Sequence, residues 1–288
     1  MYRIVRKEVL APGLKRFDVE APLVARSARA GQFIILRLDE WGERIPLTIA
    51  DLDPEQGTVT IIFQEVGKST QLLGQLEEGE YIRDFVGPLG RPSHISQLGR
   101  VVMIGGGVGI APIHPIAREM KRAGNEVISI LGARNRQLLI LEEEMKQAST
   151  EVLITTDDGS YGRKGLVTKV LQELIIHRSP INLVVSIGPL VMMEAVCRVT
   201  QAAGIKTMVS LNPIMVDGTG MCGACRVQVG AETRFACVDG PEFDGHLVDW
   251  KLARQRAQMF VAEEKQALQE HEERRKGGLG GCDCHCHQ

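Results

Sequence analysis

The first hundred residues alternate short apolar runs with turns rich in glycine and proline. Val59, Ile61 and Phe63 occupy alternate positions, and this period of two predicts a strand with one buried face. Several short strands at this spacing indicate a small antiparallel β-barrel. The predicted strands are 3–10, 15–19, 32–38, 58–66 and 81–86, and a short helix is predicted at 69–76.

A different pattern begins near residue 100. Residues 101–104 form a continuous apolar run, which is typical of a strand buried on both faces. From there strand and helix patterns alternate, and this predicts an α/β doubly wound parallel sheet. Further strands are predicted at 126–131, 151–155, 182–187 and 205–210, with one helix ending near Gly124 and others at 138–147, 165–177 and 192–203.

The pattern therefore divides the chain into a barrel at 1–98, an α/β domain at 99–210 and a small cysteine-containing module at 211–250. Residues 251–275 predict one charged helix with a narrow apolar side that could pack on this chain or on a partner. That side consists of Leu252, Met259, Phe260, Ala267 and Leu268. The tail at 276–288 is rich in glycine and ends in alternating Cys and His, and we expect disorder there rather than metal capture.

Composition narrows the class of protein. The chain has 288 residues, a net charge of −2 and a pI near 6.4, so we expect neither a nucleic-acid surface nor a polybasic membrane surface. The N-terminus lacks the apolar segment of a signal peptide, and no run of about 18 apolar residues predicts a membrane span. We therefore expect a cytoplasmic protein whose seven cysteines serve metal or redox chemistry rather than disulfides.

The strongest chemical signal is the spacing Asp217-x4-Cys222-x2-Cys225-x11-Cys237. Plant-type [2Fe-2S] proteins use Cys-x4-Cys-x2-Cys and a later Cys, so three of the four ligand positions match. The glycines of this segment suit a loop that must wrap a cluster. Zinc sites usually have two Cys-x2-Cys pairs, whereas this segment has one, so the spacing favours the cluster over zinc or unliganded core cysteines.

Asp217 stands where the first thiolate would be. An Asp before Gly is also common in turns, so a turn role is the alternative. A carboxylate carries the same single negative charge as a thiolate but is a harder donor. Its register in the ligand frame favours a cluster ligand that changes the reduction potential.

Two segments of the barrel suit a diphosphate. Arg44 can pair with phosphate, Pro46 fixes the backbone, and Thr48 offers a hydroxyl at the start of a strand. Residues 66–70 run from a strand into a helix, whose first amides could hold a phosphate. The segment is not a Walker loop, because Ile62 occupies the position of the first required glycine.

A third segment, Gly105-Gly106-Gly107-Val-Gly109-Ile-Ala-Pro112, follows the first strand of the α/β domain. It suits close approach of a dinucleotide diphosphate, although it lacks the G-x-G-x-x-G fingerprint. The alternative is that the glycines only let the helix pack tightly on the sheet. Gly188 ends a later strand on the same carboxyl edge, where ligands of such sheets bind.

Taken in order, these segments and the cysteine loop resemble the ferredoxin–NADP reductase superfamily. The order of domains is similar to that of the electron-transfer subunit of dihydroorotate dehydrogenase, whose pattern uses four cysteines. The strings 213–225 and 235–243 are similar to another branch, the small subunits of NADH-dependent reduced ferredoxin:NADP+ oxidoreductases, also named sulfide dehydrogenase beta subunits. In that branch one Asp and three Cys hold the [2Fe-2S] cluster. The resemblance covers nearly the whole chain before about Lys276.

The resemblance implies FAD in the barrel, NAD(H) on the parallel sheet and a [2Fe-2S] cluster in the C-terminal module. For FAD it implies Arg44, Pro46, Leu47 and Thr48, with Ile62, Phe63 and Gln64 alongside and Gly67, Ser69 and Thr70 at the phosphates. For NAD(H) it implies Gly105, Gly106, Gly107 and Gly109, with Arg134, Asn135, Asp157 and Gly188 nearby. The cluster ligands are Asp217, Cys222, Cys225 and Cys237.

The resemblance also implies a larger flavoprotein partner, similar to the small subunit of glutamate synthase and carrying iron–sulfur clusters. The expected role is electron bifurcation, with NAD(H) bound here and with ferredoxin and NADP(H) used by the complex. Flavin can exchange hydride with NAD(H) and single electrons with a cluster, so no side-chain nucleophile is required. Arg134 and Arg136 could pair with a 2′-phosphate, so the choice of NADH over NADPH rests on the resemblance alone.

Two alternatives stay open at this point. One is the electron-transfer subunit of dihydroorotate dehydrogenase. The other, from a different class, is a non-enzymatic iron–sulfur sensor that has lost nucleotide binding, against which the intact Arg44–Thr48 and Gly105–Pro112 motifs speak.

Overall fold

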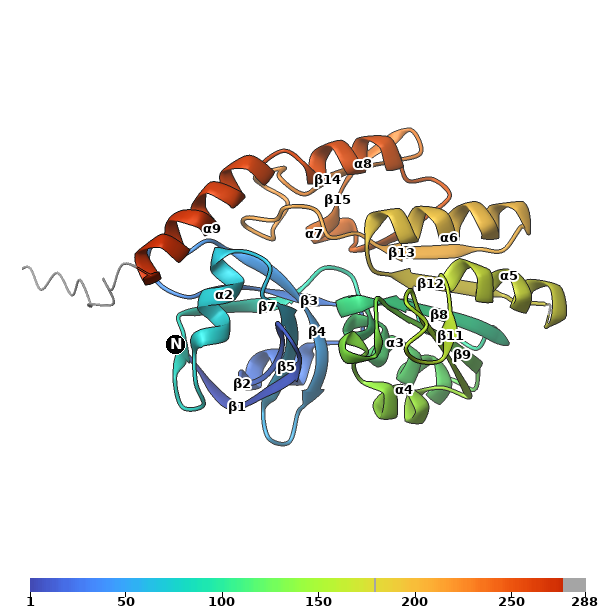
Figure 1. The fold of residues 1–288 in the computed structure, drawn as a ribbon, viewed down its shortest axis with the longest axis horizontal. Coiled ribbons are helices and arrows are strands. Elements are labelled where there is room, and N and C mark those ends of the chain that lie inside the picture. Colours follow the sequence, from blue (N-terminus) through green and yellow to red (C-terminus); the bar gives the residue numbers. More distant parts are fainter. Residues whose placement is uncertain (179, 277–288) are drawn as a thin grey trace, which may run out of the picture.

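A computed structural model describes residues 1–178 and 180–276. Figure 1 shows the N-terminal barrel in blue to cyan beside the α/β domain in green to yellow, with the C-terminal part lying across both. The three-part fold predicted from the sequence is confirmed. Of the tail predicted at 276–288, all residues after Lys276 lie outside the described residues.

The barrel is one antiparallel sheet of seven strands in the order β6-β1-β2-β5-β4-β3-β7. Its edge strands β6 and β7 are separated in the chain only by Arg83, so the sheet nearly closes on itself. The strands are β1 Tyr2–Ala11, β2 Leu14–Glu20, β3 Phe33–Arg37, β4 Ile45–Asp53, β5 Thr58–Gln64, β6 Tyr81–Ile82 and β7 Asp84–Leu89. The helices are α1 Pro22–Ser27 and α2 Lys68–Gln75.

Strand β5 is buried on both of its faces, whereas the alternating sequence pattern predicts burial of only one. Val59, Ile61 and Phe63 lie in the barrel core, as the period of two predicts. The opposite face is buried as well, so the prediction of a single buried face was wrong. Thr60 donates a hydrogen bond of 2.6 Å to Asp18, and Ile62 packs into the core of the α/β domain.

The α/β domain has a second seven-stranded sheet in the order β11-β10-β9-β8-β12-β13-β16. All its neighbouring strands are parallel except β13 and β16, and β16 comes from the predicted cysteine module. The strands are β8 Arg100–Gly106, β9 Glu126–Ala133, β10 Glu151–Thr156, β11 Arg163–Lys164, β12 Leu183–Ile187, β13 Thr207–Ser210 and β16 Glu242–Asp244. A separate hairpin consists of β14 Arg226–Val229 and β15 Glu232–Phe235.

Helices cover both faces of the parallel sheet. α3 (Ile110–Arg122) and α4 (Glu142–Ala148) share one apolar core with the sheet, and α5 (Val167–His177) and α6 (Leu190–Ala202) share the other. The short α7 (Ala236–Asp239) follows β15. This arrangement is the doubly wound architecture that the alternating pattern predicted.

Two predicted helices are wrong in extent. The helix predicted at 138–147 begins only at Glu142, after a 3-10 turn at Arg136–Leu138. Ile140 and Leu141 are buried in the core, and Leu141 adopts a left-handed backbone (φ 54°) that stops the helix from starting earlier.

The helix predicted at 251–275 is two helices, α8 (Trp250–Ala257) and α9 (Val261–Lys276). The chain turns between them near Met259 and Phe260, which are about half exposed. α8 packs on α6 and β14, whereas α9 runs back to α2 on the barrel (Figure 1). Both helices thus contact this chain.

The barrel and the α/β domain share a buried interface between β4 and α3. Arg118 on α3 pairs with Asp51 on β4 at 2.8 Å, and the buried His114 lies 3.4 Å from the carbonyl oxygen of Ala50. Burial lowers the pKa of His114, and the positive charge of Arg118 adds to this effect against the opposing Asp51 and Glu144. The native state therefore disfavours the charged form of His114.

This burial predicts a pH dependence of stability. Because the pKa of His114 is lower in the folded than in the unfolded chain, where it is about 6.5, the unfolded chain binds more protons below that pH. Wild-type stability should fall as the pH drops from about 7.5 to about 5.5, and His114→Gln should remove part of this slope. Urea titrations at several pH values measure it, and parallel curves for the two proteins would contradict the prediction.

Candidate functional site

The predicted nucleotide residues come from the carboxyl ends of four neighbouring strands. In the parallel register, Gly105 on β8 pairs with Leu131 on β9 and with Ile187 on β12. Thr156, at the end of β10, pairs with Ala133. The segments that follow these strands therefore meet at one edge of the sheet, where open α/β sheets bind ligands.

The glycines at this edge have two different roles. A Cβ on Gly105, Gly106 or Gly109 would meet Ile110, Met192 or Ile187 respectively, so tight packing accounts for these three. Gly107 has a left-handed backbone (φ 58°), and nothing lies within 4 Å of where its Cβ would be. Gly107 therefore leaves open space beside the start of α3, as a bound diphosphate requires.

The other predicted nucleotide residues follow neighbouring strands at this edge. Arg134 and Asp157 are exposed, and the Asp157 amide donates to the carbonyl oxygen of Ala133 at 3.1 Å. The Asn135 side chain accepts a hydrogen bond from the Leu138 amide and so caps the 3-10 turn. The structure brings Arg134, Asn135, Asp157 and Gly188 to the same edge, and their contact with a nucleotide stays a prediction.

The Arg136 side chain, near this edge, stacks on an aromatic ring. Its guanidinium lies 4.7 Å from the ring centre of Tyr161, and the Tyr161 hydroxyl donates to Glu142 at 2.8 Å. A carboxylate therefore lies close to the arginine that could have paired with a 2′-phosphate.

The predicted flavin segment lies on β4, directly beside β3. Pro46, Leu47 and Thr48 are half-buried, and Pro46 pairs with Ile35 on β3. Arg44 is exposed just before the strand and forms no ion pair within the described part of the chain. On the neighbouring β5, Ile62 and Phe63 are buried in cores and Gln64 is half-buried.

The start of α2 is capped by its own residues. Gly67 precedes the helix, and its amide donates to the Thr70 hydroxyl at 3.1 Å. The Ser69 hydroxyl contacts the carboxylate of Glu43. The helix N-terminus at the predicted phosphate position therefore has an adjacent carboxylate, which a phosphate would have to displace.

Two of the predicted cluster cysteines are already in contact. The sulfur atoms of Cys225 and Cys237 lie 3.1 Å apart and both residues are buried. Burial, followed by the hydrogen bond with Cys225, raises the pKa of Cys237 to about 12. Cys222 is exposed on the same loop.

Asp217 forms the turn that precedes these cysteines. Its carboxylate accepts hydrogen bonds of 2.8 Å from the amides of Thr219 and Cys222. Both bonds lower the pKa of Asp217, and the bond from Thr219 has the larger effect. The turn role is therefore present in the structure. A carboxylate has room for further partners, so the role as a ligand is compatible with it and stays a prediction.

The chemistry of this loop fits a [2Fe-2S] cluster. It offers three thiols and one carboxylate, and Gly218, Gly220 and Gly223 all have left-handed backbones that let the loop wrap tightly. Within residues 1–178 and 180–276, no three His, Cys, Asp or Glu side chains lie close enough to hold a single metal ion.

The cysteine loop rests on the barrel. A Cβ on Gly218 would lie 2.8 Å from the Cδ1 atom of Ile35 and 2.7 Å from the Cδ1 atom of Leu89, on β3 and β7. Cys225 and Cys237 share one apolar core with Phe33 and Ile35 of the barrel. The loop therefore lies next to the strand that pairs with the predicted flavin segment.

Sequence reasoning missed two residues that hold this loop. Arg226 and Arg256 donate hydrogen bonds to the carbonyl oxygens of Gly223 and Ala224. Arg226 follows Cys225 directly, but nothing in the sequence indicates that the distant Arg256 folds back onto the loop.

Comparison with known proteins identifies the family of this chain. Residues 212–249 match the iron–sulfur cluster binding domain of dihydroorotate dehydrogenase B, and residues 103–198 match the oxidoreductase NAD-binding domain. A Thermotoga maritima protein, the electron transfer subunit homolog of dihydroorotate dehydrogenase B (NAD(+)), is 47% identical over 91% of this chain and 92% of its own. The chain belongs to this family of electron-transfer subunits and their homologues.

Two further proteins are similar to this chain over almost its whole length. A protein in the adh 3′ region of Clostridium beijerinckii is 51% identical over 99% of both chains. A solved structure of the NADH-dependent reduced ferredoxin-NADP oxidoreductase, from work on flavin-based electron bifurcation, is 43% identical with a TM-score of 0.90. It covers 94% of this chain and 98% of that chain.

The family establishes an oxidoreductase with an NAD-binding domain and an iron–sulfur cluster-binding domain, as predicted. The alternative of a non-enzymatic sensor is therefore set aside. No helix among the described residues is both long and apolar enough to cross a membrane.

The contact between the cysteine loop and the barrel predicts the effect of Gly218→Ala. A left-handed backbone costs a residue other than glycine roughly 1–2 kcal/mol, and overpacking against Ile35 and Leu89 should add about 1–3 kcal/mol. Gly230→Ala is the matched control, because Gly230 is left-handed (φ 58°) but has nothing within 4 Å of a Cβ. Denaturant unfolding and iron content measure both, and equal losses would contradict the contact.

Proposed function

We propose that the chain is the NAD(H)-binding electron-transfer subunit of a flavin- and iron–sulfur-containing complex. FAD occupies the barrel at β4 and α2, NAD(H) binds at the carboxyl edge of the parallel sheet, and a [2Fe-2S] cluster sits in the loop after Asp217. The complex is an electron-bifurcating NADH-dependent ferredoxin:NADP+ oxidoreductase. Its larger partner is a flavoprotein with iron–sulfur clusters that resembles the small subunit of glutamate synthase.

One observation carries this proposal: the cysteine loop packs on the barrel strand next to the predicted flavin segment. Gly218 lies against Ile35, and Ile35 pairs with Pro46 on β4. A flavin held at β4 and a cluster held by the loop would be near neighbours, as electron transfer between them requires. The match of the solved ferredoxin-NADP oxidoreductase over almost the whole of both chains supports the same arrangement.

The residues of the chain act by binding and positioning. When bound, the flavin supplies the exchange between a two-electron hydride and single electrons. Arg44 neutralises the flavin diphosphate, and Thr48 offers a hydroxyl to the flavin from β4. Gly107 admits the nucleotide diphosphate beside α3. Asp217, Cys222, Cys225 and Cys237 hold the cluster, and burial of the last two keeps water from that side.

The position of Asp217 favours the bifurcating branch over dihydroorotate dehydrogenase. A carboxylate stands at the first ligand position, where the pattern of the dihydroorotate dehydrogenase subunits has a cysteine. The family relatives named for dihydroorotate dehydrogenase B keep that enzyme as the second candidate. Both candidates require a larger partner, and both place this chain on the NAD(H) side.

Isolation of the native complex tests the proposal. A tagged chain purified without oxygen from its own host should carry a stoichiometric flavoprotein with iron–sulfur clusters. The complex should oxidise NADPH rapidly only when NAD+ and ferredoxin are both present. Co-purification with an orotate-forming enzyme instead would replace the proposal with the second candidate. A complex that reduces ferredoxin without NAD+ would contradict bifurcation.

The exposed Arg44 predicts the effect of its removal on flavin binding. A charge-assisted contact to a diphosphate is worth roughly 1.5–3 kcal/mol, so Arg44→Ala should weaken FAD affinity roughly 10- to 150-fold. Arg83→Ala is the control, because Arg83 lies on the same barrel but pairs with Glu40 at 2.9 Å. Flavin fluorescence titration of the apoprotein measures both. Equal affinities in the two variants would remove Arg44 from the flavin site.

Asp217 can be tested in both of its roles with two substitutions. If it is a ligand, Asp217→Ala should lose iron faster, whereas Asp217→Cys should keep the cluster with an altered reduction potential. If Asp217 only forms the turn through its bonds to the amides of Thr219 and Cys222, both variants should keep the spectrum and the reduction potential of the wild type. Visible and electron paramagnetic resonance (EPR) spectra distinguish the two roles.

A further inference from the structure

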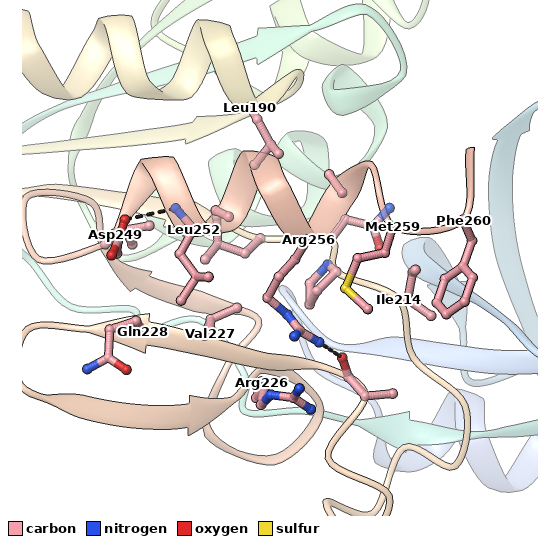
Figure 2. A pocket seen from close by; sticks show the side chains of 17 residues that line it. Leu190, Ile214, Arg226, Val227, Gln228, Asp249, Leu252, Arg256, Met259 and Phe260 are labelled. Carbon is pink, nitrogen blue, oxygen red and sulfur yellow. Dashed lines mark hydrogen bonds between the residues drawn. The ribbon is translucent and has the colours of Figure 1, made fainter. Parts of the chain in front are cut away.

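Two arginines hold the turn that carries the predicted cluster cysteines. Arg226 begins β14 immediately after Cys225, and its Nη1 donates to the carbonyl oxygen of Gly223 at 3.0 Å. Arg256 reaches down from α8, and its Nη2 donates to the carbonyl oxygen of Ala224 at 2.8 Å (Figure 2). Consecutive carbonyls of one turn are therefore both held by guanidinium groups.

Neither guanidinium has a carboxylate partner in the described part of the chain. The Nε of Arg256 is buried without any hydrogen-bond partner. The two side chains border a cavity of about 190 Å³ between α8 and β14, whose lining is mostly apolar (Figure 2). The one carboxylate of that lining, Asp249, accepts a hydrogen bond from the Leu252 amide at the start of α8.

This arrangement is costly unless an anion lies close by. Two like charges side by side repel each other, and burying part of a guanidinium without a counter-ion carries a desolvation penalty. A neutral side chain could hold a carbonyl oxygen at smaller cost. The charge itself therefore needs a partner, and the loop that both arginines hold is the predicted site of an anionic group.

A [2Fe-2S] cluster with three thiolates and a carboxylate is negative overall, and it becomes more negative when it accepts an electron. Positive charge fixed beside it stabilises the reduced form more than the oxidised form. Net charge and hydrogen bonding around a cluster are known determinants of its reduction potential.

We propose that Arg256, assisted by Arg226, is a positioning residue that fixes the turn between Cys222 and Cys225 and raises the reduction potential of the cluster. This inference rests on the proposed function, because it requires the cluster in this loop. Arg256 has the larger effect, since its Nε is buried. Arg226 is exposed, so solvent and salt screen its charge.

The test is an EPR-monitored redox titration of the full chain with its cluster. Arg256→Met removes the charge at similar volume and should shift the reduction equilibrium about tenfold toward the oxidised form, which is about 59 mV for one electron. Arg256→Lys keeps the charge and should stay close to wild type. Arg254→Met is the matched control, because Arg254 lies on the same helix and pairs with Glu194 instead of the loop.

Each outcome decides. An unchanged potential in Arg256→Met, or equal shifts in Arg256→Met and Arg254→Met, would overturn the inference. If Arg256→Met loses the cluster, the titration of Arg226→Met takes its place. The reduction potential of Arg226→Met must then fall by less than the shift of about 59 mV predicted for Arg256→Met, and a potential that does not fall would overturn the inference. A wild-type chain that binds no iron at all would instead overturn the proposed function, and this result is distinguishable from an unchanged potential.

Discussion

The structure depends on one apolar core that three parts of the chain share. Phe33 and Ile35 of the barrel, Val209 of the parallel sheet, and Cys225 and Cys237 of the cysteine module are all buried in it. Each large apolar side chain buried there contributes roughly 1.5–3 kcal/mol. This core, and not only the connecting segments, fixes the cysteine loop against the barrel and the sheet, so the distances between the predicted cofactors are built into the fold.

Hydrogen bonds at the edges of that core fix the loop in detail. The Arg91 amide of the barrel segment donates to the carbonyl oxygen of Gly240 at 2.6 Å, and Ser93 contacts Glu242 on β16. β16 is also a strand of the parallel sheet. Residues 240–244 therefore connect the cysteine module to both the barrel and the sheet. The Arg118–Asp51 pair and the buried His114 join the barrel to the sheet on another side.

The sequence predicts local features well because they depend on nearby residues. The strand–helix alternation after residue 100, the glycine turn at Gly107 and the cysteine spacing are all local patterns, and the fold confirms the alternation. Features set by distant contacts are not in these patterns. The second buried face of β5 exists because Ile62 meets another domain, and the break before α9 allows that helix to return to α2. Arg256 contacts the cysteine loop only because α8 folds back over it. Contact between the predicted site residues and the cofactors stays a prediction.

The central claim is that electrons pass between NAD(H) and a cluster through a flavin held in this one chain. The most direct measurement is an anaerobic NADH titration of the purified chain, followed by visible absorption and EPR. We expect two irons and one FAD per chain, loss of the flavin absorption on addition of NADH, and the EPR signal of a reduced [2Fe-2S] cluster. Zinc in place of iron, or a flavin that NADH leaves oxidised, would contradict the account.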